Sequence, residues 1–131
     1  MSTNKTYQIA FDERREYLFA RLTCYAPSVE TATAYMREIL QESIELGYTR
    51  ILLDRNITSH LTAVDVSVVA SGLRDLKVDG IRMAVVDAGL DAMQRKQFAD
   101  AASSGLGIEF KVHRGLPRAR RWLIGHLSHD K

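Results

Sequence analysis

The feature that most constrains the fold is a regular succession of strand-like and helix-like segments after an opening hairpin. Two runs that alternate between the two sides of a strand, 6–12 and 17–25, flank a short charged stretch, which predicts an antiparallel hairpin. Helix-like segments then separate three further strand-like segments, at 50–54, 81–87 and 108–113. Strands that alternate with helices form a parallel sheet through right-handed crossovers. The sequence therefore predicts an α/β fold with the order β-β-α-β-α-β-α-β-α and a mostly parallel five-stranded sheet.

Capping residues define most of the predicted helix boundaries. Ser28 is expected to cap the first helix, and Gly47 to end it in a left-handed conformation. The segment 62–65 resembles a capping box and opens a helix that we expect to run to about residue 76. A third helix is predicted over 91–103, followed by a flexible exit at 104–107. Pro117 suits the first turn of a last helix.

The strand patterns also predict how the two faces of the sheet differ. Sequential right-handed crossovers place their helices on the same face of a sheet. The first, second and last strands alternate in polarity, whereas strands buried on both faces read as continuous apolar runs. We therefore expect helices mainly on one face and a more open second face. The candidates for the open face are Gln8, Arg21, Arg50, Arg82, Glu109 and Lys111.

Length and composition suit a single domain over residues 1–131, with a tail at 128–131 that we expect to be frayed. The net charge of +2 is too balanced to favour nucleic-acid binding by electrostatics. The one cysteine, Cys24, lies among apolar neighbours and is expected to be a packed thiol. The start of the chain lacks the apolar core of a signal peptide, and no apolar run approaches membrane-spanning length. These observations predict a cytoplasmic protein without integral membrane association.

Several segments together resemble a known family. They are the opening hairpin YQIAFDERREYLFARLTCY, the helix end ILQESIELGY, and the strand segments RILLD, IRMAVVD and IEFKVHRG. This succession resembles the STAS domain, the fold of bacterial anti-sigma-factor antagonists, and more closely the SpoIIAA-like group of small single-domain proteins. The resemblance implies binding to a partner kinase. It also implies a switch, in which a Ser or Thr is phosphorylated in a D-S-S-G-like motif after the strand that ends at Asp54.

The expected switch motif is missing from its place. Counting from Asp54, the motif would fall at 63–66, where the sequence reads Ala-Val-Asp-Val, with Asp65 at about the switch hydroxyl. The similar segment 71–73 comes too late before the next strand, and 103–106 lies at a helix exit rather than at a helix start. We therefore predict a non-enzymatic regulatory or protein-interaction module of STAS-like type without the phosphorylatable switch.

The loop and helix start after the strand at 50–54 form the predicted partner-binding site, because partner and ligand sites collect at such strand ends. A homodimer through the open sheet face or the hairpin edge is a further arrangement that the pattern allows. A Ser-His-Asp reading of this segment is disfavoured, since adjacent Ser and His side chains rarely face each other and no elbow motif surrounds the Ser. The candidate partner-binding residues are Arg55, Thr58, Ser59, His60, Thr62 and Asp65.

Two other patterns carry weaker hypotheses. Metal-like residue types and spacing occur at His126, His129 and Asp130, to which His113 could be added, but these residues lie towards the tail that we expect to be frayed, so we predict no metal. No glycine-rich phosphate loop follows a strand, and we predict no cofactor. A basic cluster favours a solvated helix face, with an acidic partner or a phosphate-bearing or membrane surface as the alternative. That cluster comprises Lys111, His113, Arg114, Arg118, Arg120 and Arg121.

The alternative function is a carrier of a small hydrophobic ligand or lipid, suggested by analogy with the CRAL-TRIO fold. Such a carrier needs an apolar pocket between the helices and aromatic side chains. The aromatic candidates are Phe19, Tyr25, Tyr35 and Trp122.

Overall fold

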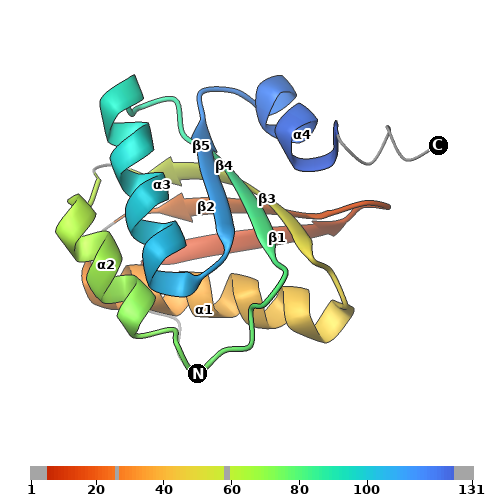
Figure 1. Ribbon diagram of the computed structural model, residues 1–131, viewed down its shortest axis with the longest axis horizontal. Helices are drawn as coiled ribbons and strands as arrows, with labels where there is room; N and C mark the ends of the chain where they lie inside the picture. The colour runs from red at the N-terminus through yellow and green to blue at the C-terminus, as the bar shows by residue number, and fades with distance from the viewer. Residues whose placement is uncertain (1–5, 26, 58–59, 126–131) are drawn as a thin grey trace.

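The computed structural model describes residues 6–25, 27–57 and 60–125, which contain one sheet with the strand order β1-β2-β3-β4-β5 (Figure 1). The strands are β1 (Tyr7–Glu13), β2 (Leu18–Cys24), β3 (Arg50–Ile57), β4 (Arg82–Val86) and β5 (Glu109–His113). The helices are α1 (Val29–Leu46), α2 (Ala63–Ser71), α3 (Ala92–Leu106) and α4 (Leu116–Ile124). β1 pairs with β2 in antiparallel fashion, and the other neighbours pair in parallel. The predicted order of elements and the mixed sheet are confirmed.

The predicted caps are present. The Ser28 hydroxyl accepts a hydrogen bond from the Thr31 N–H at 3.0 Å, and Gly47 ends α1 with a φ of 82°. Thr62 and Asp65 form a reciprocal capping box at the start of α2. Local backbone chemistry therefore sets these helix ends, as the sequence suggested.

Three boundaries differ from the prediction by three or more residues. β3 continues to Ile57, so Arg55 lies in a strand rather than in the following loop. α2 already ends at Ser71, and α3 continues to Leu106. The extension of α3 includes Gly105, where an added β-carbon would overlap the side chain of Ala70 on α2. This glycine therefore lets two helices approach closely and does not mark a flexible exit.

The main core lies between the sheet and the helices α1, α2 and α3, which cover the same face (Figure 1). The central strands supply fully buried side chains to it, including Leu53 on β3 and Val85 on β4. The buried thiol of Cys24 lies in this core, as expected for a packed cysteine. Three of the four helices of the described chain thus confirm that the helices lie mainly on one face.

The fourth helix, α4, lies on the opposite face (Figure 1). Its buried residues Ala119 and Leu123 pack in a second apolar cluster with Leu52 of β3. Two arginines of this face also bind α4, since Arg50 donates to the Leu123 carbonyl at 3.1 Å and Arg82 to the Trp122 carbonyl at 2.8 Å. Among the described residues α4 does not connect two parallel strands, so crossover handedness does not constrain the face it covers.

The predicted open-face residues all belong to this second face, by strand register and side-chain alternation. Arg50 and Arg82 are partly covered, whereas the remaining candidates are exposed: Gln8, Arg21, Glu109 and Lys111. The predicted frayed tail, 128–131, lies outside the described residues. Among the helices that the structure describes, none has the length and apolar character needed to cross a bilayer.

Candidate functional site

A buried ion pair joins the ends of β3 and β4. Arg55 points to the helix-covered face of the sheet, and its Nε donates to Asp87 Oδ2 at 3.0 Å. Only 8% of the Arg55 side chain and 5% of the Asp87 side chain are exposed. A buried charge is strongly destabilising without a partner, so each of these two residues requires the other.

Two further groups bind the same carboxylate. His60 Nε2 lies 3.0 Å from Asp87 Oδ2 and 3.2 Å from Oδ1. The Gly89 N–H donates to Oδ1 at 3.0 Å. The Asp87 carboxylate thus contacts groups from β3, from the loop before α2 and from its own loop. We call Arg55, His60 and Asp87 the strand-end cluster.

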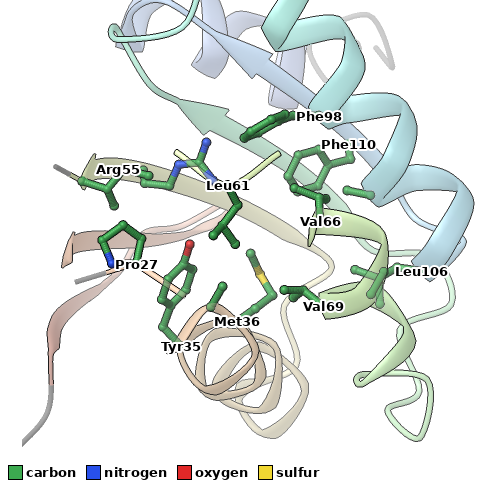
Figure 2. A pocket seen from close by; sticks show the side chains of 14 residues that line it. Pro27, Tyr35, Met36, Arg55, Leu61, Val66, Val69, Phe98, Leu106 and Phe110 are labelled. Carbon is green, nitrogen blue, oxygen red and sulfur yellow. The ribbon is translucent and has the colours of Figure 1, made fainter. Parts of the chain in front are cut away.

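A pocket of about 50 Å³ adjoins Arg55 between the sheet and the helices α1, α2 and α3 (Figure 2). Apart from Arg55 and Tyr35, its lining side chains are apolar; those labelled in Figure 2 are Pro27, Met36, Leu61, Val66, Val69, Phe98, Leu106 and Phe110. An engineered apolar cavity of about 150 Å³ holds one benzene molecule. The enclosed part of this pocket therefore suits only a few heavy atoms.

The polar edge of the pocket is the Arg55 guanidinium. Its Nη2 is buried and has no hydrogen-bond partner among the residues that the structure describes. The guanidinium carbon lies 5.8 Å from the centre of the Phe98 ring, a cation–π distance. The Tyr35 phenol oxygen points toward the same space (Figure 2), and burial raises the pKa of Tyr35 although the Arg55 charge opposes that shift. The pocket thus combines apolar walls with one cationic donor that has no partner among the described residues.

The predicted partner-binding residues have different environments. Arg55 is buried, and His60 has 22% of its side chain exposed and contacts Asp87. The hydrogen bonds found for His60 run to Asp87 rather than to Asp65, whose carboxylate accepts from the Thr62 N–H at 3.3 Å. Thr58 and Ser59 lie outside the described residues. The structure therefore brings Arg55 and His60 together through a residue that was not among the predicted set.

The aromatic residues expected around a carrier pocket are mostly elsewhere. Tyr35 lines the pocket, but Phe19 and Trp122 belong to the cluster under α4 on the other face of the sheet. Tyr25 is 58% exposed. Of the four candidates, Tyr35 is thus the one that lines this pocket; Phe19 and Trp122 do not reach it, because neighbouring residues of a strand face opposite sides and α4 packs on the second face.

The metal-like residues His126, His129 and Asp130 lie outside the described residues. Within the part of the chain that the structure describes, no group of three His, Cys, Asp or Glu side chains could hold a metal ion.

Sequence reasoning missed Asp87 as a member of the site. A signal for it exists, because Asp87 directly follows the most hydrophobic strand segment and precedes a loop with Gly89. A carboxylate at the end of a buried parallel strand is well placed to meet groups from the neighbouring strand end.

Neither a protein-family model nor a curated protein matches the chain. Among solved structures, it is similar to an uncharacterized protein of the DUF3478 family with a SpoIIAA-like fold, from Shewanella loihica PV-4. The two share 17% sequence identity, the match covers 94% of this chain and 98% of that chain, and the TM-score is 0.53. At this identity the likeness shows the fold alone, and the fold of this chain is SpoIIAA-like.

Proposed function

We propose that the chain is a non-enzymatic, STAS-like interaction module that binds a protein partner through the start of α2 and the loop before it. One observation carries this proposal. Val64 and Val68 are 73% and 50% exposed and lie four residues apart, so they present one apolar stripe to solvent. Burying a valine side chain contributes about 1.5 kcal/mol or more, so this pair offers a partner a few kcal/mol.

The base of α2 is suited to a fixed recognition surface. The capping box of Thr62 and Asp65 stabilises the first turn, and both side chains are engaged in hydrogen bonds to backbone N–H groups. Asp65, near the position of the switch hydroxyl in the resembling family, supplies a fixed negative charge at the helix start, where the helix dipole favours it. We infer a module without phosphorylation control at this position, and a surface that stays available to its partner.

A binding role is also supported by the chemistry of the strand-end cluster. The Asp87 carboxylate accepts from Arg55, from His60 and from a backbone N–H. These are stabilising contacts of a buried charge, and they do not require a reaction to explain them. Neither the charge balance of the chain nor this surface favours nucleic acid as the partner.

The test is a matched pair of double variants. Val64→Gln/Val68→Gln removes the apolar stripe of α2, and Ile44→Gln/Leu46→Gln changes two exposed aliphatic residues of α1 to the same degree. Tagged proteins are used to capture partners from the source cells, and analytical ultracentrifugation tests whether a second copy of the chain is the partner. We expect the α2 variant to lose the partner by tenfold or more, since buried unpaired amides cost about 1–3 kcal/mol each. Equal capture by both variants, with unchanged thermal unfolding, would refute this surface.

The second candidate is a carrier of a small hydrophobic ligand. The apolar lining of the pocket beside Arg55 favours it, although the enclosed volume of about 50 Å³ holds only a few heavy atoms of such a ligand. Native mass spectrometry of the purified protein separates the two functions. A bound small molecule that is released on denaturation supports the carrier, and a bare chain counts against it.

A further inference from the structure

A basic groove of about 930 Å³ lies at the carboxyl ends of β4 and β5, apart from the surfaces described above. The starts of α3 and α4 adjoin it, since each helix follows the end of one of these strands (Figure 1). In α/β sheets, ligands bind in the crevice outside the carboxyl ends of the strands. Five cations line the groove: Arg95, Lys111, Arg114, Arg118 and Arg121.

Among the residues that the structure describes, no acidic side chain neutralises the groove. No acidic residue is among its lining residues, and none of its five cations forms an ion pair within the described part of the chain. Nearby cations behave differently, because Arg82 pairs with Glu109 and Lys96 pairs with Asp100. Arg120 of the predicted basic cluster is also excluded from the groove lining, and it donates to the Tyr17 hydroxyl instead. The groove therefore concentrates positive charge that an anion can bind.

A buried imidazole forms part of the groove wall. His113 is 7% exposed, and its Nε2 has no hydrogen-bond partner among the described residues. Its ring centre lies 5.7 Å from that of Trp122, which also lines the groove. Burial, together with the charges of Lys111, Arg95 and Arg118, lowers the pKa of His113 to about 4. A neutral imidazole that lacks a partner thus adjoins a groove rich in cations.

The first turn of α4 offers a third kind of anion-binding group. Gly115 is the N-cap of α4, and no side chain caps the helix start within the described structure. Pro117 in this turn has no N–H, but the other uncapped N–H groups at the helix start attract an anion, and the helix dipole adds to the attraction.

We propose that this groove binds the phosphate group of a phosphorylated ligand that carries at least two negative charges. Guanidinium groups match phosphate oxygens in bidentate geometry, and several cations around one site favour a multiply charged anion over a single carboxylate. The ligand is a free phosphorylated small molecule or the headgroup of a phospholipid, because both present the same chemistry. This proposal does not depend on the α2 surface or on the pocket beside Arg55.

The test uses pyrophosphate as the probe and the intrinsic fluorescence of Trp122, the only tryptophan of the chain. Lys111→Gln and Arg118→Gln each remove one groove cation, and Arg74→Gln removes an exposed arginine outside the groove. At low salt we expect each groove variant to weaken pyrophosphate binding about tenfold, as for loss of one charge-assisted hydrogen bond, and Arg74→Gln to change it less than about twofold. Equal weakening by all three variants would show that net charge alone attracts the anion, and would overturn the site.

Two further binding experiments identify the ligand chemistry. Citrate that binds as tightly as pyrophosphate would overturn the assignment to phosphate. Vesicles of phosphatidylcholine with and without phosphatidic acid test the lipid source. Binding to phosphatidic acid that depends on Lys111 and Arg118, without pyrophosphate binding, assigns the site to a headgroup. Binding of neither probe refutes the proposal.

The pKa of His113 distinguishes binding at this groove wall from nonspecific binding elsewhere on a basic surface. A bound phosphate beside the ring favours the imidazolium, so pyrophosphate is expected to raise the pKa of His113 from about 4 toward its ordinary value. The groups that act on this ring are Lys111 of its own strand β5, Arg95 of α3, and Arg118 and Trp122 of α4. An NMR titration of the ring protons measures the shift, and an unchanged titration at saturating pyrophosphate contradicts binding at this wall.

Discussion

Replacing Asp87 by Asn tests how far the strand-end cluster depends on one negative charge. The substitution keeps the size of the side chain and one carbonyl oxygen, but it removes the charge that faces Arg55. The Arg55 side chain is only 8% exposed, so its charge cannot regain its hydration without rearrangement. Breaking a buried pair by removing one partner costs about 3–5 kcal/mol.

The loss is a large part of the stability of a small domain, which amounts to about 5–15 kcal/mol. Urea unfolding followed by circular dichroism measures it. With a slope of about 2 kcal/mol per molar urea, the midpoint is expected to fall by about 2 M. Asp100→Asn is the matched control, because Asp100 is 65% exposed and pairs with Lys96 at 3.0 Å on the surface of α3. That exposed pair contributes less than about 0.5 kcal/mol.

A second substitution separates loss of charge balance from loss of packing. Arg55→Met in the Asp87→Asn background removes the unpaired cation, so it is expected to recover part of the lost stability. If Asp87→Asn and Asp100→Asn differ by less than about 1 kcal/mol, the Arg55 charge is not desolvated and the reasoning is refuted.

Two other perturbations probe the packing and the electrostatics of the fold. Gly105→Ala is expected to destabilise the chain by about 1–3 kcal/mol, since the new methyl group would overlap Ala70 and force α2 and α3 apart. Thermal unfolding measures the loss, and Ser104→Ala, at an exposed neighbouring residue, is the control. Because the folded-state pKa of His113 is about 4, below its ordinary value of 6.5, the unfolded chain binds the extra proton between these values. The contribution of His113 to the free energy of unfolding is therefore fully present above pH 6.5 and decreases as the pH falls toward 4. The decrease is at most about 3 kcal/mol, and solvent in the groove makes it smaller. Urea midpoints of the wild type and of His113→Gln that show the same pH dependence over this range would contradict the buried neutral imidazole.

The order of elements could be predicted from the sequence because each signal is local. Ser28 and the pair Thr62 and Asp65 act on backbone groups within one helical turn, so their neighbours in sequence are sufficient to identify the caps. The end of α3 could not be predicted in this way. Gly105 resembles a helix terminator, but its role is set by Ala70, a residue of another helix. A contact between two helices decides whether such a glycine ends its helix, and the spacing of apolar residues within one segment does not reveal that contact.

The position of α4 shows the same limit at the level of layers. Its apolar residues predict that it packs on a sheet, but they do not say on which face. The choice is made by the second face itself, where Leu52 and Phe19 supply an apolar surface and Arg50 and Arg82 bind carbonyls at the helix end. These arginines were predicted as open-face residues, and their carbonyl contacts explain why a polar strand face can nevertheless hold a helix.

The predicted partner-binding residues all come from one segment of the chain, 55–65. Arg55 and His60 were in the predicted set, but the residue that joins them, Asp87, lies 32 and 27 residues further along. Parallel pairing of β3 with β4 brings the strand ends together, and a sequence without an alignment gives no sign of which side chains then meet. The basic cluster was visible as composition, yet Arg95 joins it only because α3 starts beside β5.

Asp87 is also the point at which the two candidate binding regions meet. Its carboxylate holds Arg55 and His60 on the helix-covered face, while its backbone N–H donates to the His113 carbonyl at 2.9 Å, beside the basic groove. The two roles use different atoms, and a side-chain substitution at residue 87 leaves the backbone donor in place. In conditions where Asp87→Asn is folded, pyrophosphate binding should therefore match the wild type. A loss comparable to that of Arg118→Gln would show that the groove depends on the strand-end cluster, and that the two regions form one site.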